Sequence, residues 1–167
     1  MKKIWFSGLI ILGILACEKD DICEGGESET PNVVMSMFDG FDPEMLKPAA
    51  KIALIAEGYA DTIFYKNTSN IQLPLQINTN ETQWSVLLYE PPTISGNDTI
   101  IKRSDIRFIY NTEEFYVSKA CGYKVNFMNF NANLLPPDST SDSWIQNISN
   151  LTSEITNDDN AHIYLYY

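Results

Sequence analysis

Beyond residue 31 the chain is a series of short apolar or alternating runs, separated by clusters of Asn, Asp, Gly and Pro. This spacing is typical of an all-β sandwich, and we expect a single antiparallel β-sandwich of the immunoglobulin-like type. No segment shows helical periodicity over three turns, and Pro48 limits residues 44–50 to one turn at most. The predicted strands are residues 33–38, 51–57, 62–65, 71–77, 82–89, 105–110, 115–119, 122–130 and 163–167.

Three details of this strand pattern are open to test. Pro74 lies inside the run 71–77, which predicts an edge strand or a bulge there. Residues 105–110 and 115–119 are expected to form a hairpin around residues 111–114, and residues 144–151 fit either a strand or a short helix. An aromatic last strand also ends many integral outer-membrane barrels, but Pro74 and the lack of a regular outward apolar band oppose that fold.

The first residues have the features of a secretory signal peptide. Lys2 and Lys3 precede an apolar run that stops at Cys17 and is too short to span a bilayer as a helix. Ile14-Leu15-Ala16-Cys17 resembles a bacterial lipobox, in which a small residue precedes the cysteine that receives the lipid. We therefore expect residues 1–16 to be cleaved and Cys17 to carry diacylglycerol and palmitate. Residues 17–31 would form an acidic tether, and residues 32–167 the β-sandwich domain.

The number of cysteines is consistent with this reading. Three cysteines leave one without a partner in an oxidising compartment. Lipidation of Cys17 removes the odd one, so that Cys23 and Cys121 remain and are expected to form a disulfide. The alternative is two buried free thiols.

Net charge excludes some partners. Removal of residues 1–16 takes away Lys2 and Lys3 and leaves nine basic against 22 acidic side chains, a net charge of −13. A protein this acidic is not expected to bind nucleic acid, which requires Lys and Arg to neutralise phosphates. Attachment to the membrane must come from the acyl chains, because several chains on one cysteine anchor a protein stably.

Several short motifs resemble one known family. They are Cys17-Glu18-Lys19-Asp20-Asp21-Ile22-Cys23, Thr30-Pro31, Phe38-Asp39, Ile71-Gln72-Leu73-Pro74-Leu75, Val117-Ser118-Lys119-Ala120-Cys121-Gly122 and Ala161-His162-Ile163. Together they resemble an uncharacterised family of Bacteroidota (flavobacterial) outer-membrane lipoproteins, a domain of unknown function, over most of residues 17–167. The resemblance implies an outer-membrane lipoprotein and provides no enzymatic role.

Two further patterns resemble signals used in that phylum. Glu18, Lys19, Asp20 and Asp21, just after the lipid cysteine, are similar to a charged surface-export signal. We expect the protein to face the cell surface, with the periplasmic face as the alternative. Asp61-Thr62-Ile63, Asp98-Thr99-Ile100 and Asp138-Ser139-Thr140 resemble an Asp-Ser/Thr-apolar acceptor, which makes Thr62, Thr99 and Ser139 candidate O-glycosylation sites.

Residues suited to catalysis are scarce. His162 is the only histidine, so neither a nucleophilic triad nor a His-rich zinc site is expected, and we interpret His162 as a structural strand residue. Acidic clusters at Asp39/Asp42 and Asp158/Asp159 match no complete calcium loop and are interpreted as solvated turns. We expect no metal, no cofactor other than the covalent lipid, and no enzymatic activity; a hydrolase with paired carboxylates is a minor alternative.

Two functional hypotheses follow. The first is a non-enzymatic accessory subunit of an outer-membrane protein complex, active in β-barrel protein assembly or export, whose partners are an outer-membrane β-barrel protein or other lipoproteins. The second is a glycan-binding surface lipoprotein of a nutrient-uptake system. It requires exposed aromatic rows, for which Trp84, Tyr89, Trp144 and the pair Tyr164/Tyr166 are the candidates.

Overall fold

The computed structural model describes residue 23 and residues 29–90, 100–137 and 143–167. These residues form ten strands and no helix, so none of them belongs to a helix long and apolar enough to cross a membrane. The strands are β1 (Val33–Phe38), β2 (Ala49–Ala56), β3 (Thr62–Thr68), β4 (Asn70–Leu73), β5 (Glu81–Glu90), β6 (Ile100–Ser118), β7 (Gly122–Leu134), β8 (Asn147–Asn150), β9 (Glu154–Ile155) and β10 (Ile163–Tyr166).

The chain forms two compact units. One, which we call the sandwich, comprises Thr30–Glu113 and Val125–Tyr167. The other joins Glu114–Lys124, which we call the hairpin tip, to the segment that ends at Glu29. Strand β6 ends in the hairpin tip, and strand β7 begins there.

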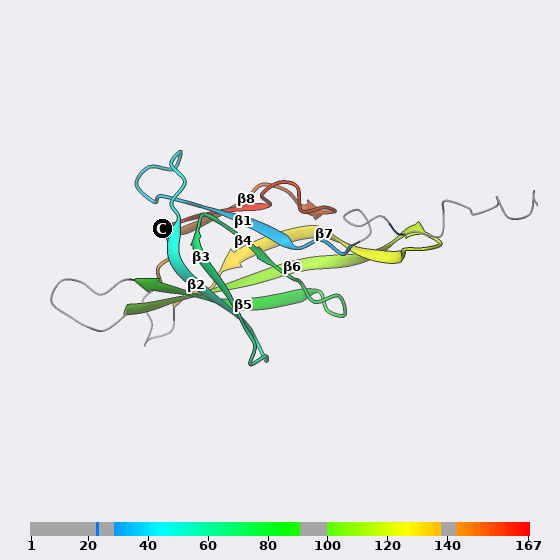
Figure 1. The fold of residues 1–167 in the computed structure, drawn as a ribbon, viewed down its shortest axis with the longest axis horizontal. Coiled ribbons are helices and arrows are strands. Elements are labelled where there is room, and N and C mark those ends of the chain that lie inside the picture. The colour runs from blue at the N-terminus through cyan, green and yellow to red at the C-terminus, as the bar shows by residue number, and fades with distance from the viewer. Residues whose placement is uncertain (1–22, 24–28, 91–99, 138–142) are drawn as a thin grey trace, which may run out of the picture. The chain divides into compact units, whose positions relative to one another are not determined.

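Two sheets form the sandwich, which confirms the predicted all-β sandwich. The first has the order β4-β1-β10-β8 and the second the order β3-β2-β5-β6-β7-β9 (Figure 1). The pairs β1–β4, β8–β10, β2–β3, β2–β5, β5–β6 and β7–β9 are antiparallel, whereas β1 and β10 pair in parallel, with Met35 opposite Ile163. The last strand thereby lies beside the first, and both are central strands of the smaller sheet.

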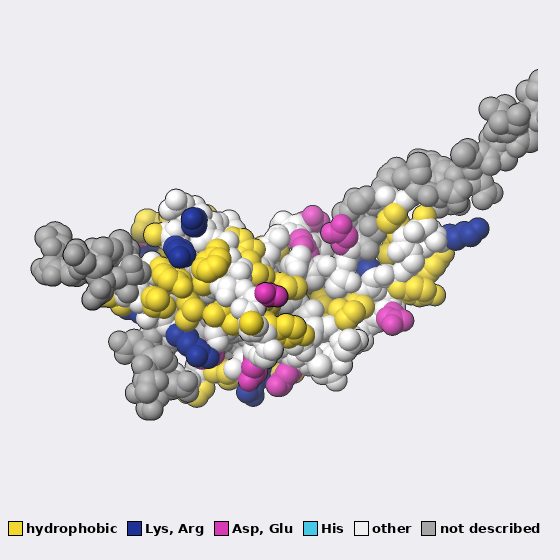
Figure 2. Space-filling view, turned by 60° about the horizontal axis from the view of Figure 1, so that its bottom comes forward, with side chains coloured by type: hydrophobic (Ala, Val, Ile, Leu, Met, Phe, Trp, Pro, Cys, Tyr) yellow, Lys and Arg dark blue, Asp and Glu magenta, His cyan; other side chains and the backbone are white. Residues whose placement is uncertain are grey.

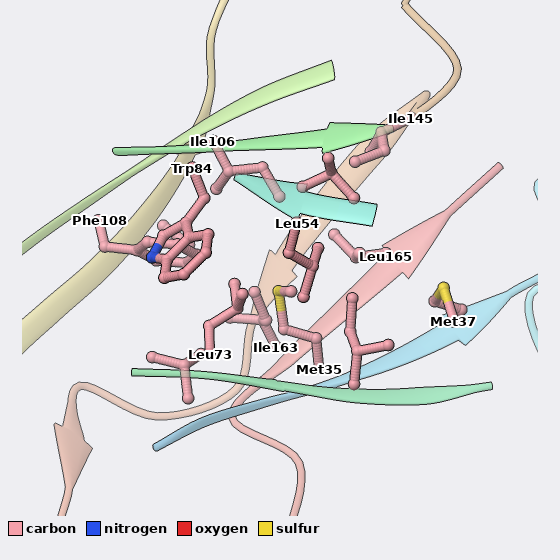
Figure 3. Close-up of a cluster of buried hydrophobic side chains, with 14 of the residues drawn as sticks. Met35, Met37, Leu54, Leu73, Trp84, Ile106, Phe108, Ile145, Ile163 and Leu165 are labelled. Atoms are coloured by element: carbon pink, nitrogen blue, oxygen red, sulfur yellow. The ribbon is translucent and has the colours of Figure 1, made fainter. Parts of the chain in front are cut away.

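The core lies between the two sheets, where alternate residues of each strand meet. In β5 every second residue from Thr82 to Leu88 is buried, which is the period of two that a sheet with one buried face requires. Met35, Ile163 and Leu165 from the smaller sheet point toward Leu54 and other residues of the larger one (Figure 3). Burial of each such aliphatic side chain stabilises the fold by about 1.5–3 kcal/mol relative to exposure.

Pro74 ends β4, as its position in the run 71–77 suggested. Strand β4 stops at Leu73 and lies at the edge of the smaller sheet, so Pro74 removes no ladder hydrogen bond. The carbonyl of Pro74 accepts a hydrogen bond from Trp84 Nε1 (3.2 Å). Residues 147–150 of the ambiguous segment 144–151 form a strand, and the single turn allowed for residues 44–50 is not helical.

The predicted hairpin around residues 111–114 is wrong. Strand β6 runs without interruption from Ile100 to Ser118, and the chain reverses at residues 119–121 instead. A tight reversal favours a residue with positive φ, and Gly122 supplies it at φ 73°. Residues 111–114 contain no glycine that could adopt positive φ at a tight reversal. They stay extended within β6, which pairs with its neighbouring strands.

Candidate docking surface

The outward side of the larger sheet carries apolar and basic side chains together with the carboxylates Glu81 and Asp105. In β2 the core residues Ile52 and Leu54 alternate with Lys51, Ala53 and Ile55, which therefore point outward. Strand register extends this side across the sheet, because Ala53 lies opposite both Phe64 and Leu87, and Leu87 lies opposite Arg103. We call this the outer face and define it by Lys51, Ala53, Ile55, Phe64, Leu87, Tyr89, Ile101 and Arg103.

A lysine lies between two aromatic rings on the outer face. Lys51 Nζ is 4.2 Å from the centroid of the Tyr89 ring and 5.0 Å from that of Phe64. Such cation–π contacts are worth about 0.5–1 kcal/mol at exposed sites, and they hold the ammonium group in place. A fixed cation with apolar rings on two sides can bind a carboxylate whose neighbours are apolar.

Where β2, β3, β5 and β6 pair with one another, their outward side carries four basic residues (Lys51, Lys66, Arg103 and Arg107) and two acidic ones (Glu81 and Asp105). Lys66 lies opposite Lys51 in the β2–β3 pair, and Arg107 lies opposite Gln83 on the same side as Arg103. Arg103 is partly neutralised by Asp105, at 3.0 Å. Since the chain after residue 16 has a net charge of −13, this gathering of cations departs from the general charge.

Apolar exposure on the outer face is also high. Phe64 and Ile101 are each 53% exposed, whereas Ala53 between its neighbours is 1% exposed. Figure 2 brings forward the side that faces down in Figure 1. On this side, exposed hydrophobic side chains lie next to Lys and Arg. Contiguous exposed apolar surface with a polar border is typical of protein interaction sites.

A separate cavity of about 520 Å³ lies at one end of the sandwich. Tyr59, Ile63, Pro74, Ile77 and Trp84 provide much of its apolar lining, and Asp61 adds a carboxylate. Apolar lining with few polar groups suits an apolar side chain of a partner or a small apolar ligand.

A ring of hydrogen bonds fixes the loop beside this cavity. The Gln76 N–H donates to Thr82 Oγ1 (2.9 Å), and the Tyr110 hydroxyl donates to the Gln76 carbonyl (2.7 Å). The ring closes through a hydrogen bond between Thr82 Oγ1 and the Tyr110 hydroxyl. Each polar group in the ring has a partner, so Thr82 and Tyr110 are accommodated in the core.

The predicted disulfide is present: Cys23 is bonded to Cys121 across a sequence separation of 98 residues. Of the three candidate glycosylation residues, Thr62 is described; it is the half-buried first residue of β3. Thr99 and Ser139 lie outside the described residues. So do residues 1–16, Cys17 and the charged residues Glu18, Lys19, Asp20 and Asp21.

His162 lies just before β10 and is 6% exposed. Its Nδ1 accepts a hydrogen bond from the Val34 N–H (2.9 Å), and the backbone N–H of His162 donates to the Val34 carbonyl (2.8 Å). Burial lowers the pKa of His162, although a hydrogen bond with the Asn157 backbone and the charge of Asp158 oppose this. These contacts give His162 a structural role at the junction of β1 and β10.

The carboxylates of the acidic clusters form hydrogen bonds and an ion pair with other residues of the protein. Asp39 Oδ1 accepts hydrogen bonds from the backbone N–H groups of Phe41 (2.8 Å) and Asp42 (3.3 Å), and Oδ2 pairs with Lys47 at 3.1 Å. The hydrogen bond from Phe41 is the largest cause of a lowered pKa for Asp39. Asp158 accepts hydrogen bonds from the backbone and side chain of Asn32. Within residues 23, 29–90, 100–137 and 143–167, no three His, Cys, Asp or Glu side chains gather as a metal site would require.

The expected aromatic platform does not form from the two tryptophans. Trp84 is 5% and Trp144 6% exposed, and Trp144 Nε1 donates to the Val86 carbonyl (2.9 Å). Tyr164 and Tyr166 are half-buried beside Phe38, at ring-centroid distances of 4.6 and 5.9 Å. Tyr89 belongs to the outer face described above.

Comparison with known proteins places this sandwich in a family. A family model described as a family of unknown function, DUF6452, matches residues 51–167. The chain belongs to the DUF6452 family. The match covers every strand from β3 to β10 and most of β2, and therefore all residues of the outer face. No curated protein and no solved structure matches the chain.

The outer face was not predicted, although the sequence contains part of its signal. In the run 51–57 the second alternating set contains the apolar residues Ala53 and Ile55 between Lys51 and Glu57, whereas a solvated face is ordinarily polar throughout. The grouping of Lys51, Phe64 and Tyr89 becomes visible only with the strand register, because the three residues come from three strands.

Proposed function

We propose that this DUF6452 protein is a non-enzymatic, lipid-anchored accessory subunit of an outer-membrane protein complex, which binds a partner protein through its outer face. The partner would be an outer-membrane β-barrel protein or another lipoprotein. The observation that carries the proposal is Lys51 held between Phe64 and Tyr89 on an exposed apolar sheet face. The chemistry of this face fits a partner surface with an apolar centre and acidic side chains around it.

Burial of the outer face supports this assignment energetically. Apolar surface removed from water contributes about 25 cal/mol per Å², and Phe64 and Ile101 both have about half of their surface available. Aromatic residues and Arg are enriched among the residues that dominate binding energy in protein interfaces. The basic side chains would guide an acidic partner and set its orientation.

The anchor is the second element of the proposal. A lipid on Cys17 and cleavage of residues 1–16 would confine the protein to the membrane surface, which raises its effective concentration beside membrane partners. Orientation toward the cell surface is part of the same proposal and depends on the charged residues that follow Cys17.

The glycan-binding alternative has weaker support. It relied on Trp84 and Trp144 as stacking surfaces, and both are buried. The remaining aromatic residues of the outer face surround a lysine instead of forming a flat row, which favours a protein carboxylate over a sugar ring.

The test is purification of the tagged protein from native outer membranes in mild detergent, followed by mass spectrometry of the co-purifying proteins. We expect one membrane protein in stoichiometric amount with the native chain and with Lys51→Arg. Phe64→Glu and Lys51→Glu should abolish its recovery. The matched control is Leu151→Glu, because Leu151 is 45% exposed and lies outside the outer face.

Each result bears on a different part of the proposal. Recovery of the native protein alone would refute the role as an accessory subunit. Unchanged recovery with Phe64→Glu and Lys51→Glu would refute the outer face as the docking surface. Thermal unfolding of each variant separates loss of binding from loss of folding.

A further inference from the structure

The hairpin tip exposes three aromatic rings. Phe115 and Tyr116 are each 53% exposed and Tyr123 is 66% exposed. Tyr116 and Tyr123 contact each other edge to face, with ring centroids 5.2 Å apart, and Lys124 Nζ lies 6.0 Å from the centroid of Phe115. Phe115 and Tyr116 lie near the end of β6 and Tyr123 near the start of β7, so the three exposed rings flank one turn. Exposed apolar side chains gathered in this way are typical of interaction sites.

The charge of this segment is the opposite of that of the chain. The hairpin tip contains two lysines, Lys119 and Lys124, and one acidic residue, Glu114, which gives a net charge of +1. The chain after residue 16 carries −13. A segment that combines Tyr and Phe with Lys matches the headgroup layer of an anionic bilayer, where amphipathic rings and lysines are both favoured.

The disulfide determines how far this segment can lie from a lipid on Cys17. Cys121 in the turn is bonded to Cys23, which is six residues after Cys17. A fully extended chain spans at most about 3.3–3.6 Å per residue, so Cys121 stays within about 25 Å of the lipidated residue. Tyr123 follows Cys121 by two residues.

We propose that the hairpin tip is a second membrane contact, in which Phe115, Tyr116 and Tyr123 enter the headgroup layer of an anionic bilayer. This inference rests on the lipid anchor proposed above and not on the outer face. The lipid on Cys17 brings the bilayer within reach, and the Cys23–Cys121 bond keeps the three rings there. A tether without the bond would leave the hairpin tip free to move away from the membrane.

Tryptophan fluorescence can test this contact directly. The lipidated protein with Tyr123→Trp is reconstituted in vesicles of phosphatidylethanolamine and phosphatidylglycerol that contain a lipid with a nitroxide-labelled headgroup, because a nitroxide quenches tryptophan on contact. The native Trp84 and Trp144 are buried and provide the baseline. The matched control is Phe41→Trp in the sandwich, where Phe41 is 91% exposed.

We expect the added tryptophan at 123 to be quenched and blue-shifted, and the one at 41 to be neither. Replacement of both Cys23 and Cys121 by serine should reduce the quenching at 123 while the lipid is retained. Equal quenching at the two positions, or none at 123, would overturn the proposal. The mass of the N-terminal peptide separates the two failures: an unlipidated Cys17 refutes the anchor itself, whereas a lipidated Cys17 without quenching refutes only the second contact.

Discussion

The side-chain amide of Asn150 forms two hydrogen bonds with the backbone of Ala132. The Ala132 N–H donates to Asn150 Oδ1 (2.7 Å), and Asn150 Nδ2 donates to the Ala132 carbonyl (3.0 Å). Asn150 belongs to β8 at the edge of the smaller sheet, and Ala132 to β7 of the larger sheet. One side chain therefore acts like a residue of a neighbouring strand and links the two sheets.

Asn150→Ala should destabilise the sandwich by about 1–3 kcal/mol, because it leaves both backbone groups of Ala132 without a protein partner. Asn150→Asp keeps an acceptor for the Ala132 N–H but turns a carboxylate oxygen toward the Ala132 carbonyl, so it should also destabilise the sandwich. Urea unfolding measures both changes. Asn147→Ala is the control, because Asn147 is exposed at the start of the same strand and has no side-chain hydrogen bond to lose; an equal loss there would exclude the Ala132 contact as the cause.

Tyr110→Phe should also destabilise the sandwich by about 1–3 kcal/mol, since removal of the hydroxyl leaves the Gln76 carbonyl without its donor and the Thr82 hydroxyl with only the bond from the Gln76 N–H. Thr82→Val should lower the unfolding free energy less in the Tyr110→Phe background than in the native protein. A double-mutant cycle of unfolding free energies gives the coupling. Strict additivity of the two substitutions would show that the ring of hydrogen bonds does not act as a unit.

The disulfide should contribute about 4–5 kcal/mol in the chain-entropy model, because it closes a loop of 98 residues in the unfolded chain. We expect Cys23→Ser together with Cys121→Ser to lower the unfolding free energy by up to that amount. Chemical denaturation of the native protein with and without reductant provides the comparison. If the serine variant responded to reductant, or the native protein did not, this bond would not be the source of the stability.

The sequence predicted the fold class and most strands because their signals are local. The apolar run 33–38 matches β1 residue for residue, and Pro74 marks the end of an edge strand. Strand β6 was misread because residues 111–114 have turn-like composition, whereas its pairing with neighbouring strands determines where the chain reverses. The two-residue strand β9 is too short to produce a pattern and forms by pairing with β7, where Phe127 lies opposite Ile155.

The candidate site was less predictable than the fold. Cys23 and Cys121 followed from the number of cysteines, but the outer face depends on the register of four strands. The tryptophans were natural candidates for a binding platform, yet their apolar area is used in the core, where Trp144 packs edge to face on Tyr167 at 4.9 Å. Exposure of an aromatic ring is a tertiary property that composition does not contain.

The stability of the sandwich should fall as the pH is lowered from about 7 toward 5, with His162 as one cause. Its pKa is lowered in the folded protein, chiefly by burial, relative to the value of about 6.5 for an unfolded chain. Between these two values the unfolded state binds the additional proton, so acid favours unfolding. The contribution is present in full above the unfolded pKa and is lost as the pH falls through the folded one.

His162→Asn should make the unfolding free energy less dependent on pH in this range. The Asn side chain retains an acceptor for the Val34 N–H and does not titrate, whereas protonation of His162 at Nδ1 would place a donor against that N–H. His162→Leu removes the acceptor and should be less stable at every pH, because the buried Val34 N–H then has no side-chain partner. Urea unfolding of the three proteins at several pH values distinguishes these effects. An unchanged slope in His162→Asn would assign the pH dependence to the carboxylates instead.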